Sequence, residues 1–183
     1  MLKGEHDKAM KDSRRKLTMN KPTIKFAKVK PQAIIPSKRD EDGAFDVYAC
    51  FEEEHMVIKP HETKMIPTGI ASVFSQDYVA MLKERGSTGS KGMGQRCGVV
   101  DSGYRGEWFC PITNHNNVPL IITKNQKVCE LVSNVAVVYP YTKAIAQCMM
   151  VQVPRLAIEE ITYDELLTYE SERGLGALGS SNK

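Results

Sequence analysis

The stretch G-V-V-D-S-G-Y-R-G, residues 98–106, predicts a short strand that runs into an acidic turn. Val99 and Val100 are β-branched and favour the strand, and the glycines that follow favour a tight turn carrying Tyr104. A carboxylate at a strand end is suited to act as a general base or to bind a metal. An aspartate in a turn also bonds often to the amides of that turn. These residues alone leave both roles open for Asp101.

The turn lies within a longer glycine-rich segment, residues 83–107, in which glycines alternate with hydroxyl and cationic side chains. Glycine lets the backbone approach a ligand closely and aim its N–H groups at an anion. Arg85 can hold a phosphate with two parallel donors, and the Ser87 hydroxyl can add a third. The P-loop pattern G-x-x-x-x-G-K-[ST] is absent. The segment is therefore either an ordinary surface loop or a phosphate-binding loop.

Short apolar pieces separated by turn residues fill most of the chain on both sides of this segment. Glycine, proline, asparagine or aspartate stands in nearly every gap, and a helical period is almost absent. This pattern of short apolar segments and turn residues predicts an all-β sandwich or barrel. One helical turn is expected where Thr162-x-x-Glu165 forms a capping box. The expected strands lie in residues 23–29, 44–51, 65–74, 78–82, 108–113, 118–123, 128–139 and 144–153.

The 183 residues carry a formal net charge of +3, and the charge is unevenly placed. Residues 1–21 hold seven basic and three acidic side chains, which leaves 18 against 19 in the remainder. Such a basic tail is typical of a solvated, disordered arm, and nucleic-acid contact is the less favoured alternative. No apolar stretch approaches the ~20 residues of a membrane span, and no secretory signal is expected.

Five cysteines occur in the chain, and their number and spacing exclude a disulfide framework or a zinc site. No C-x-x-C pair and no Cys/His ligand spacing is present. We expect reduced, mostly buried thiols in a cytoplasmic protein.

Five segments of the chain, in order, resemble the motifs of the trimeric all-β dUTP pyrophosphatases (dUTPases), of the phage or bacterial type. Residues 98–106 are similar to the third motif. Residues 43–49, G-A-F-D-V-Y-A, resemble the first motif, and residues 84–89, E-R-G-S-T-G, resemble the second. Residues 143–147, K-A-I-A-Q, resemble the fourth, and residues 173–181, R-G-L-G-A-L-G-S-S, resemble the fifth. One such motif is weak evidence, whereas five in family order are strong evidence.

This resemblance implies a jelly-roll-like β-barrel that assembles as a homotrimer with three shared active sites. The barrel would span residues 22–157 and would include an extended segment, residues 115–142, that could add a hairpin at a sheet edge. Residues 1–21 would form a disordered extension. Residues 158–183 would form a mobile, glycine-rich C-terminal arm that closes over the site of a neighbouring subunit.

The resemblance also implies hydrolysis of dUTP to dUMP and pyrophosphate with Mg²⁺, with Asp101 as the general base. Asp46 would have a structural role or contact the metal through water. The other implied roles fall into two groups. The phosphates would be held by Arg85, Gly86, Ser87, Gln147, Arg173, Ser180 and Ser181. Uracil and deoxyribose would be bound by Cys97, Gly98, Val99, Tyr104 and Leu178.

Two departures from the family pattern concern the second and fifth motifs. The second motif has Arg-Gly-Ser where Arg-Ser-Gly is usual, so its hydroxyl is moved to Ser87. Leu178 stands where the family generally has a phenylalanine that stacks on uracil, and leucine offers no aromatic face.

Two other functions stay open beside the dUTPase assignment. A dCTP deaminase shares the fold, but its proton-shuttling glutamate would fall at Pro111, so this alternative is disfavoured. A dUTPase-fold regulatory protein of phage type would use residues 1–21 or 115–142 to bind a protein partner. The expected location is the cytoplasm of a bacterial cell or of a phage-infected host.

Overall fold

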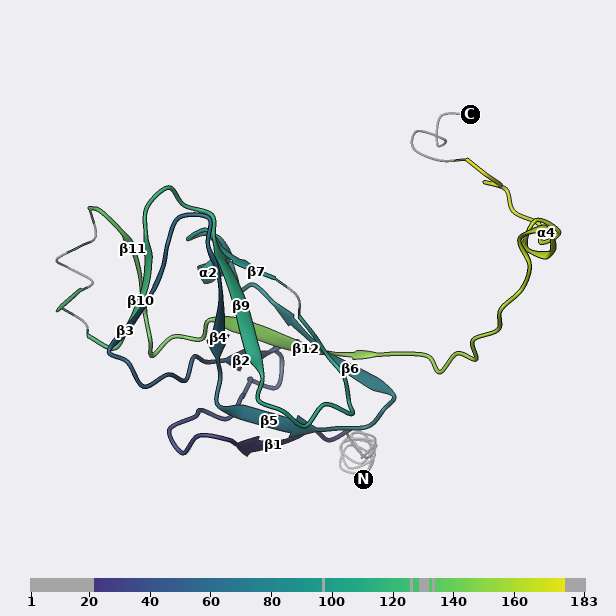
Figure 1. Cartoon of the computed structure of the whole chain (residues 1–183). Coiled ribbons are helices and arrows are strands. Elements are labelled where there is room, and N and C mark those ends of the chain that lie inside the picture. The colour runs from purple at the N-terminus through teal and green to yellow at the C-terminus, as the bar shows by residue number, and fades with distance from the viewer. Residues whose placement is uncertain (1–21, 97, 126, 129–131, 133, 177–183) are drawn as a thin grey trace, which may run out of the picture. The chain divides into compact units, whose positions relative to one another are not determined.

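The computed structural model describes residues 22–96, 98–125, 127–128, 132 and 134–176. The chain divides into two compact units, residues 1–153 and residues 154–183. The described part of the first unit, called the body below, consists of short strands with little helix (Figure 1). The all-β prediction is therefore confirmed. No helix in the described ranges is long and apolar enough to cross a membrane.

The body's described strands form four small sheets, and one of them carries the predicted site residues Asp46, Val99 and Gln147 on its strands. Its strand order is β2-β12-β6-β8, and its strands are β2 (Phe45–Val47), β12 (Ala146–Gln152), β6 (Tyr78–Lys83) and β8 (Val99–Val100). The other three sheets are β4-β9-β7, β11-β10-β3 and β1-β5. Their strands are β1 (Lys25–Lys28), β3 (His55–Ile58), β4 (Thr63–Pro67), β5 (Ile70–Val73), β7 (Met93–Gln95), β9 (Phe109–Asn114), β10 (Leu120–Thr123) and β11 (Val137–Pro140).

Alternation along the strands builds the core between these sheets. In β6 the side chains of Ala80 and Leu82 are buried, while Met81 between them is partly exposed. Successive residues of a strand face opposite sides, so one face of β6 enters the core. Trp108 is fully buried there and meets Phe26 edge to face, with ring centroids 5.5 Å apart. Trp108 is thus a core residue.

Three cysteines are buried in this core as free thiols: Cys50, Cys110 and Cys148. The remaining two, Cys97 and Cys129, lie outside the described residues. Burial raises the pKa of the Cys110 thiol and that of the Cys148 thiol to about 12. Such thiols stay protonated at neutral pH, so they act as apolar filler rather than as nucleophiles or metal ligands.

The extended segment, residues 115–142, does not form the hairpin that we expected. Its strands β10 and β11 pair in parallel, with Leu120 opposite Val137, and β10 also pairs antiparallel with β3. Two strands joined by a tight turn must run antiparallel, so this parallel pair, whose connection is residues 124–136, is not a hairpin. Lys124 fastens this connection to the body, because its Nζ donates to the carbonyl oxygens of Phe51 (2.7 Å) and Glu52 (3.0 Å).

The second unit contains the predicted helical turn, α4 (Tyr163–Leu166). The Thr162 hydroxyl accepts a hydrogen bond from the backbone N–H of Glu165 at 3.2 Å, which is the expected N-cap. Gly174 adopts a φ of 53°, and the Nε of Arg173 donates to the Gly176 carbonyl at 2.8 Å. The described part of the fifth motif therefore begins with a local turn around Arg173.

Candidate functional site

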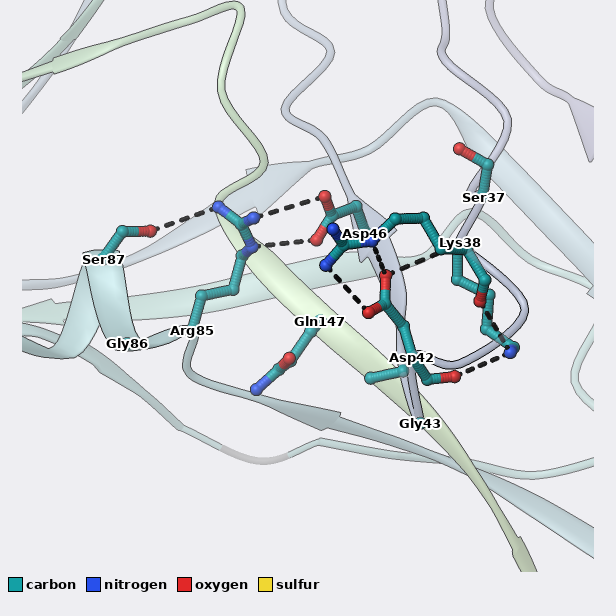
Figure 2. A pocket seen from close by; sticks show the side chains of 11 residues that line it. Ser37, Lys38, Asp42, Gly43, Asp46, Arg85, Gly86, Ser87 and Gln147 are labelled. Atoms are coloured by element: carbon teal, nitrogen blue, oxygen red, sulfur yellow. Dashed lines mark hydrogen bonds and ion pairs between the residues drawn. The ribbon is translucent and has the colours of Figure 1, made fainter.

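Arg85 is the most constrained cation of the predicted phosphate group (Figure 2). Its Nε lies 2.8 Å from Oδ1 of Asp46, and its Nη2 donates to Oδ2 of the same carboxylate at 3.3 Å. Its Nη1 donates to the Ser87 hydroxyl at 3.1 Å and to the Ala144 carbonyl at 3.4 Å. The side chains of Arg85 and Asp46 are only 28% and 36% exposed, so water weakens their attraction less than at an open surface.

Strand register brings Asp46 and Gln147 to the same place. Gln147 on β12 pairs with Asp46 on β2 and with Lys83 at the end of β6. Its side-chain amide donates to the backbone carbonyl of Glu84 at 2.7 Å. Residues from the first, second and fourth motifs therefore meet where β6 ends and β12 begins, beside β2.

The turn that follows Arg85 is fixed by Thr88, a buried member of α2 (Gly86–Gly89). The backbone N–H of Arg85 donates to the Thr88 hydroxyl at 2.9 Å, and that hydroxyl donates to the Arg85 carbonyl at 3.0 Å. Reciprocal bonds of this kind leave the backbone little freedom. The position of Ser87 beside the Arg85 guanidinium is set by this turn.

These residues line a pocket with a cavity volume of about 780 Å³, which we call the phosphate pocket. The full lining is Ser37, Lys38, Arg39, Asp42, Gly43, Ala44, Asp46, Arg85, Gly86, Ser87 and Gln147. Sequence reasoning found the motif residues but missed Ser37, Lys38, Arg39 and Asp42. Their only signal was a charged turn, K-R-D-E-D-G, immediately before the first motif.

Asp101 lies in a different pocket, of about 270 Å³, which we call the turn pocket. Gly98, Val99 and Tyr104 line it too, so the described residues of the predicted base and sugar group come together here. The carboxylate of Asp101 is exposed and makes no hydrogen bond or ion pair to any residue that the structure describes. The turn is instead closed by the backbone, since the N–H of Tyr104 donates to the Asp101 carbonyl at 3.1 Å.

At two glycines of the third motif a Cβ would come unusually close to a neighbouring group. Gly98 has a φ of 137°, and a Cβ there would lie 2.5 Å from the Leu82 carbonyl oxygen. A Cβ on Gly106 would lie 2.6 Å from Cζ of Tyr104, whose hydroxyl donates to the Glu107 carbonyl at 3.0 Å. Gly98 thus holds β8 against β6, and Gly106 makes room for the aromatic ring.

Strand β6 separates the two pockets, which share no lining residue. Val100, directly before Asp101, pairs with Ala80 near the start of β6, whereas Arg85 follows its end. The chain from Ala80 to Arg85 spans roughly 17 Å at ~3.3 Å per extended residue. The described residues of one chain therefore do not bring Asp101 and Arg85 into a single pocket.

The turn pocket also bears on the deaminase alternative. Its lining includes one further carboxylate, Glu107, whose Oε1 accepts the Gly69 N–H at 2.7 Å and lies 3.9 Å from Nζ of Lys30. Glu107 is therefore bonded to the neighbouring β4–β5 turn. The position where a deaminase would carry its glutamate is Pro111, which lies buried in β9.

The remaining predicted site residues fall outside the body. Arg173 lies in the second unit, and Cys97, Leu178, Ser180 and Ser181 lie outside the described residues. Their predicted roles stay predictions.

The phosphate pocket fits a metal bound through phosphates and waters rather than through a protein cage. The described residues contain no group of three or more histidine, cysteine, aspartate or glutamate side chains that could hold an ion directly. Both oxygens of Asp46 face Arg85, yet each keeps a lone pair for a water molecule. Mg²⁺ commonly retains several waters and binds through one or two carboxylates plus substrate phosphates, so this chemistry fits.

Comparison with known proteins points to one family. Residues 30–152 match the family model described as dUTPase. The deoxyuridine 5'-triphosphate nucleotidohydrolase of Nautilia profundicola is 29% identical over 87% of this chain and 99% of its own length. The enzyme of the same name from Neisseria meningitidis serogroup C is 32% identical over 54% of this chain and 68% of its own length.

Solved structures agree at the level of the fold. The dUTPase of Staphylococcus bacteriophage 80alpha with dUPNHPP superposes with a TM-score of 0.67 at 20% identity, covering 88% of this chain and 99% of the phage chain. The description of that structure states that phage dUTPases control transfer of virulence genes by a proto-oncogenic G protein-like mechanism. Because the matched family model spans residues 30–152, from before the first motif to the end of β12, this chain belongs to the dUTPase family.

Proposed function

We propose that this chain hydrolyses dUTP in sites that neighbouring copies build together, with Asp101 as the general base. The overall reaction is that of a dUTP diphosphatase: dUTP and water give dUMP and pyrophosphate. Since the substrate is a free nucleotide, we place the reaction in the cytoplasm of a bacterial cell or of a phage-infected host.

The observation that carries this proposal is the division of the predicted site between two pockets. Arg85, Ser87 and Gln147 lie around the phosphate pocket, while Asp101 and Tyr104 lie around the turn pocket on the other side of β6. The phosphate pocket has the predicted phosphate-binding groups but not Asp101, and the turn pocket has Asp101 but not the phosphate-binding groups. A second copy that places its turn pocket against the phosphate pocket of the first would complete the site, which supports a homotrimer with three shared sites.

In the proposed reaction the Asp101 carboxylate accepts a proton from the attacking water. The water oxygen forms a bond to the α-phosphorus as the bond from that phosphorus to the bridging oxygen breaks, and pyrophosphate leaves with the electron pair of that bond. A base must keep a free lone pair aimed at its water. The carboxylate is free of bonds to the described residues of its own turn, as this role requires.

Arg85 would hold the phosphate chain with Ser87, Gln147 and the Gly86 backbone. Phosphoryl transfer depends mainly on positioning and on stabilising negative charge, and a planar guanidinium offers paired donors to phosphate oxygens. Asp46 keeps the Arg85 guanidinium in one orientation before substrate arrives. Mg²⁺ held by the phosphates and by waters on Asp46 would neutralise charge that develops on the leaving group.

Selectivity for uracil and deoxyribose would come from the turn pocket. The Tyr104 ring, fixed by its hydrogen bond to the Glu107 carbonyl, would pack on the deoxyribose and leave no room for a 2′-hydroxyl. Backbone groups of Cys97, Gly98 and Val99 would read the edge of uracil. Leu178 would cover the base from the arm of another copy.

The C-terminal arm would act as a lid. Arg173 would contact the terminal phosphates, and Ser180 and Ser181 would donate hydrogen bonds to them. A glycine-rich segment can order over a bound ligand and exclude water, which strengthens the electrostatic contacts inside.

A substrate panel tests the proposal. Purified protein with Mg²⁺ is mixed separately with dUTP, dCTP, dTTP and UTP, and both pyrophosphate and ammonia are measured. We expect pyrophosphate from dUTP and little from the other three. Ammonia from dCTP would instead support a deaminase, and equal cleavage of UTP would contradict the role of Tyr104.

A regulatory role is a second candidate, favoured by an exposed apolar residue, Val135, in the connection between β10 and β11. Val135 in this connection is 64% exposed and belongs to neither pocket. Residues 1–21 offer a second surface in the sequence. Pulldown and gel-shift experiments that compare the full chain with residues 22–183 test the tail version, which equal partner binding by both would contradict.

A further inference from the structure

Four residues of the phosphate pocket belong to none of the five motifs: Ser37, Lys38, Arg39 and Asp42. They lie in the loop that leads into β2, and Figure 2 shows Lys38 and Asp42 on the side of the pocket opposite Ser87. Two of the pocket's three cations, Lys38 and Arg39, come from this loop. The loop therefore supplies much of the positive charge that a phosphate chain would meet.

The loop backbone is held in place although its side chains are exposed. The N–H of Asp46 donates to the Ser37 carbonyl at 2.9 Å, and the N–H of Asp42 donates to the Arg39 carbonyl at 3.1 Å. Nζ of Lys38 crosses the loop and donates to the carbonyl oxygens of Asp42 (2.6 Å) and Arg39 (3.1 Å). Arg39 is thus attached to an ordered turn rather than to a free tail.

The Arg39 guanidinium forms a two-pronged pair with Asp42. Its Nε donates to Oδ2 at 2.9 Å, and its Nη2 donates to Oδ1 at 3.0 Å. Asp42 raises the pKa of Arg39, and the negative charge of Asp46 raises it further. Arg39 therefore also interacts electrostatically with the carboxylate that holds Arg85. A phosphate group offers the same paired oxygens as this carboxylate.

The pair is suited to exchange because it is open to water. The Arg39 side chain is 88% exposed, whereas that of Arg85 is 28% exposed. Exposed ion pairs contribute little to stability, so breaking this one costs little. The lining of the pocket holds Asp42 and Asp46 as its two acids, and an unpaired Asp42 would repel a triphosphate.

We propose that Arg39 is a substrate-binding residue for the terminal phosphates of the nucleotide, and that Asp42 holds its guanidinium until a phosphate takes the carboxylate's place. This inference rests on the proposed function, since it assumes a triphosphate in the phosphate pocket. It assigns Arg39 to the outer, exposed end of the pocket, while Arg85 binds at the inner end.

The test compares substitutions of the two partners of the ion pair. If the pair is exchangeable, the two substitutions change the affinity for a triphosphate in opposite directions, whereas a purely structural pair predicts no such opposition. The affinities of Arg39→Ala and Asp42→Asn are measured for a non-hydrolysable dUTP analogue and for dUMP. We expect Arg39→Ala to weaken binding of the triphosphate about tenfold and Asp42→Asn to tighten it, since the loss of one charged contact to phosphate is of this size. Affinity for dUMP should stay the same in both.

Lys25→Ala serves as the matched control, because Lys25 is an exposed cation on β1 that lines neither pocket. Thermal midpoints of all variants confirm that they fold. Weakening by both variants, or an equal loss of dUMP and triphosphate binding, would overturn the proposal, as would an unchanged triphosphate affinity in Arg39→Ala. Wild-type turnover of dUTP separates the two claims: if dUTP is hydrolysed while Arg39→Ala binds normally, only the Arg39 assignment fails.

Discussion

At Asp101 the backbone closes the turn and the carboxylate stays free. The N–H of Tyr104 bonds to the Asp101 carbonyl, so the side chain has no partner among the described residues. Asp101→Asn keeps the size of the side chain but removes the proton acceptor. We expect turnover of dUTP to fall by roughly 10²–10⁴-fold with nearly unchanged affinity for a non-hydrolysable dUTP analogue. Turnover is followed as pyrophosphate release, and near-normal turnover would mean that another group activates the water.

Gly98, which precedes this turn, packs so closely against the backbone of β6 that no side chain fits at its position. Gly98→Ala would place a methyl group 2.5 Å from the Leu82 carbonyl oxygen at a φ of 137°. We expect the free energy of unfolding to drop by about 2–3 kcal/mol in denaturant titrations. Gly103→Ala is the matched control in the same turn, since a Cβ there meets nothing within 4 Å. Equal stability of the two variants would contradict this account of the β6–β8 contact.

The sequence was sufficient to identify the motif residues but not the residues that surround them. Arg85, Gln147 and Asp101 stand at fixed places in recognisable motifs, so they could be predicted. Arg39 could not, because its place in the pocket depends on how a charged turn folds back beside β2. The division of the site into two pockets depends on the register of β6 with β8 and β12, and a sequence pattern does not specify register between distant strands.

At the scale of elements, strands with clear alternation were predicted and irregular ones were missed. The expected strand at residues 78–82 agrees with β6, and that at residues 108–113 agrees with β9. The strands β7 and β3, of three and four residues, are too short to establish a period of two. The described part of the apolar run at residues 128–139 contains β11. The expected strand at residues 118–123 agrees with β10, but the parallel pairing of β10 with β11 could not be inferred, because parallel pairing is non-local.

The two most shielded thiols lie on strands of different sheets, Cys110 on β9 and Cys148 on β12. Their pKa values are about 12 in the folded protein and 9.0 for an unperturbed thiol, so the unfolded chain loses these protons first as pH rises. Stability contributed by the protonated thiols is complete below pH 9 and is lost as pH rises toward 12, at about 1.4 kcal/mol per pH unit for each thiol.

Denaturant titrations at several values between pH 8 and pH 11 measure this slope. The doubly substituted Cys110→Ala/Cys148→Ala protein should show a shallower alkaline decline than the wild type, because it has no core thiol to deprotonate on unfolding. Parallel declines would show that other groups dominate the alkaline limb and that these thiols are less shielded than the structure indicates.

At the scale of the whole molecule, one body supplies two incomplete pockets. The phosphate pocket has cations and no candidate base that is free of a partner, whereas the turn pocket has a free carboxylate and no arginine in its lining. Under the proposed function, this division would require further copies of the 183-residue chain to complete each site. Closed rotational symmetry repeats the same junction, so a trimer would contain three complete sites.

Mixing two inactive variants tests this central claim most directly. Arg85→Ala removes the phosphate grip and Asp101→Asn removes the base, and each protein alone should have almost no dUTPase activity. Unfolded together in equal amounts and refolded into mixed oligomers, they should recover about one quarter of wild-type activity, because one junction in four joins an intact Arg85 to an intact Asp101 from a different copy. Mixed oligomers as inactive as the separate variants would show that both residues act within the same chain, and the shared site would be wrong.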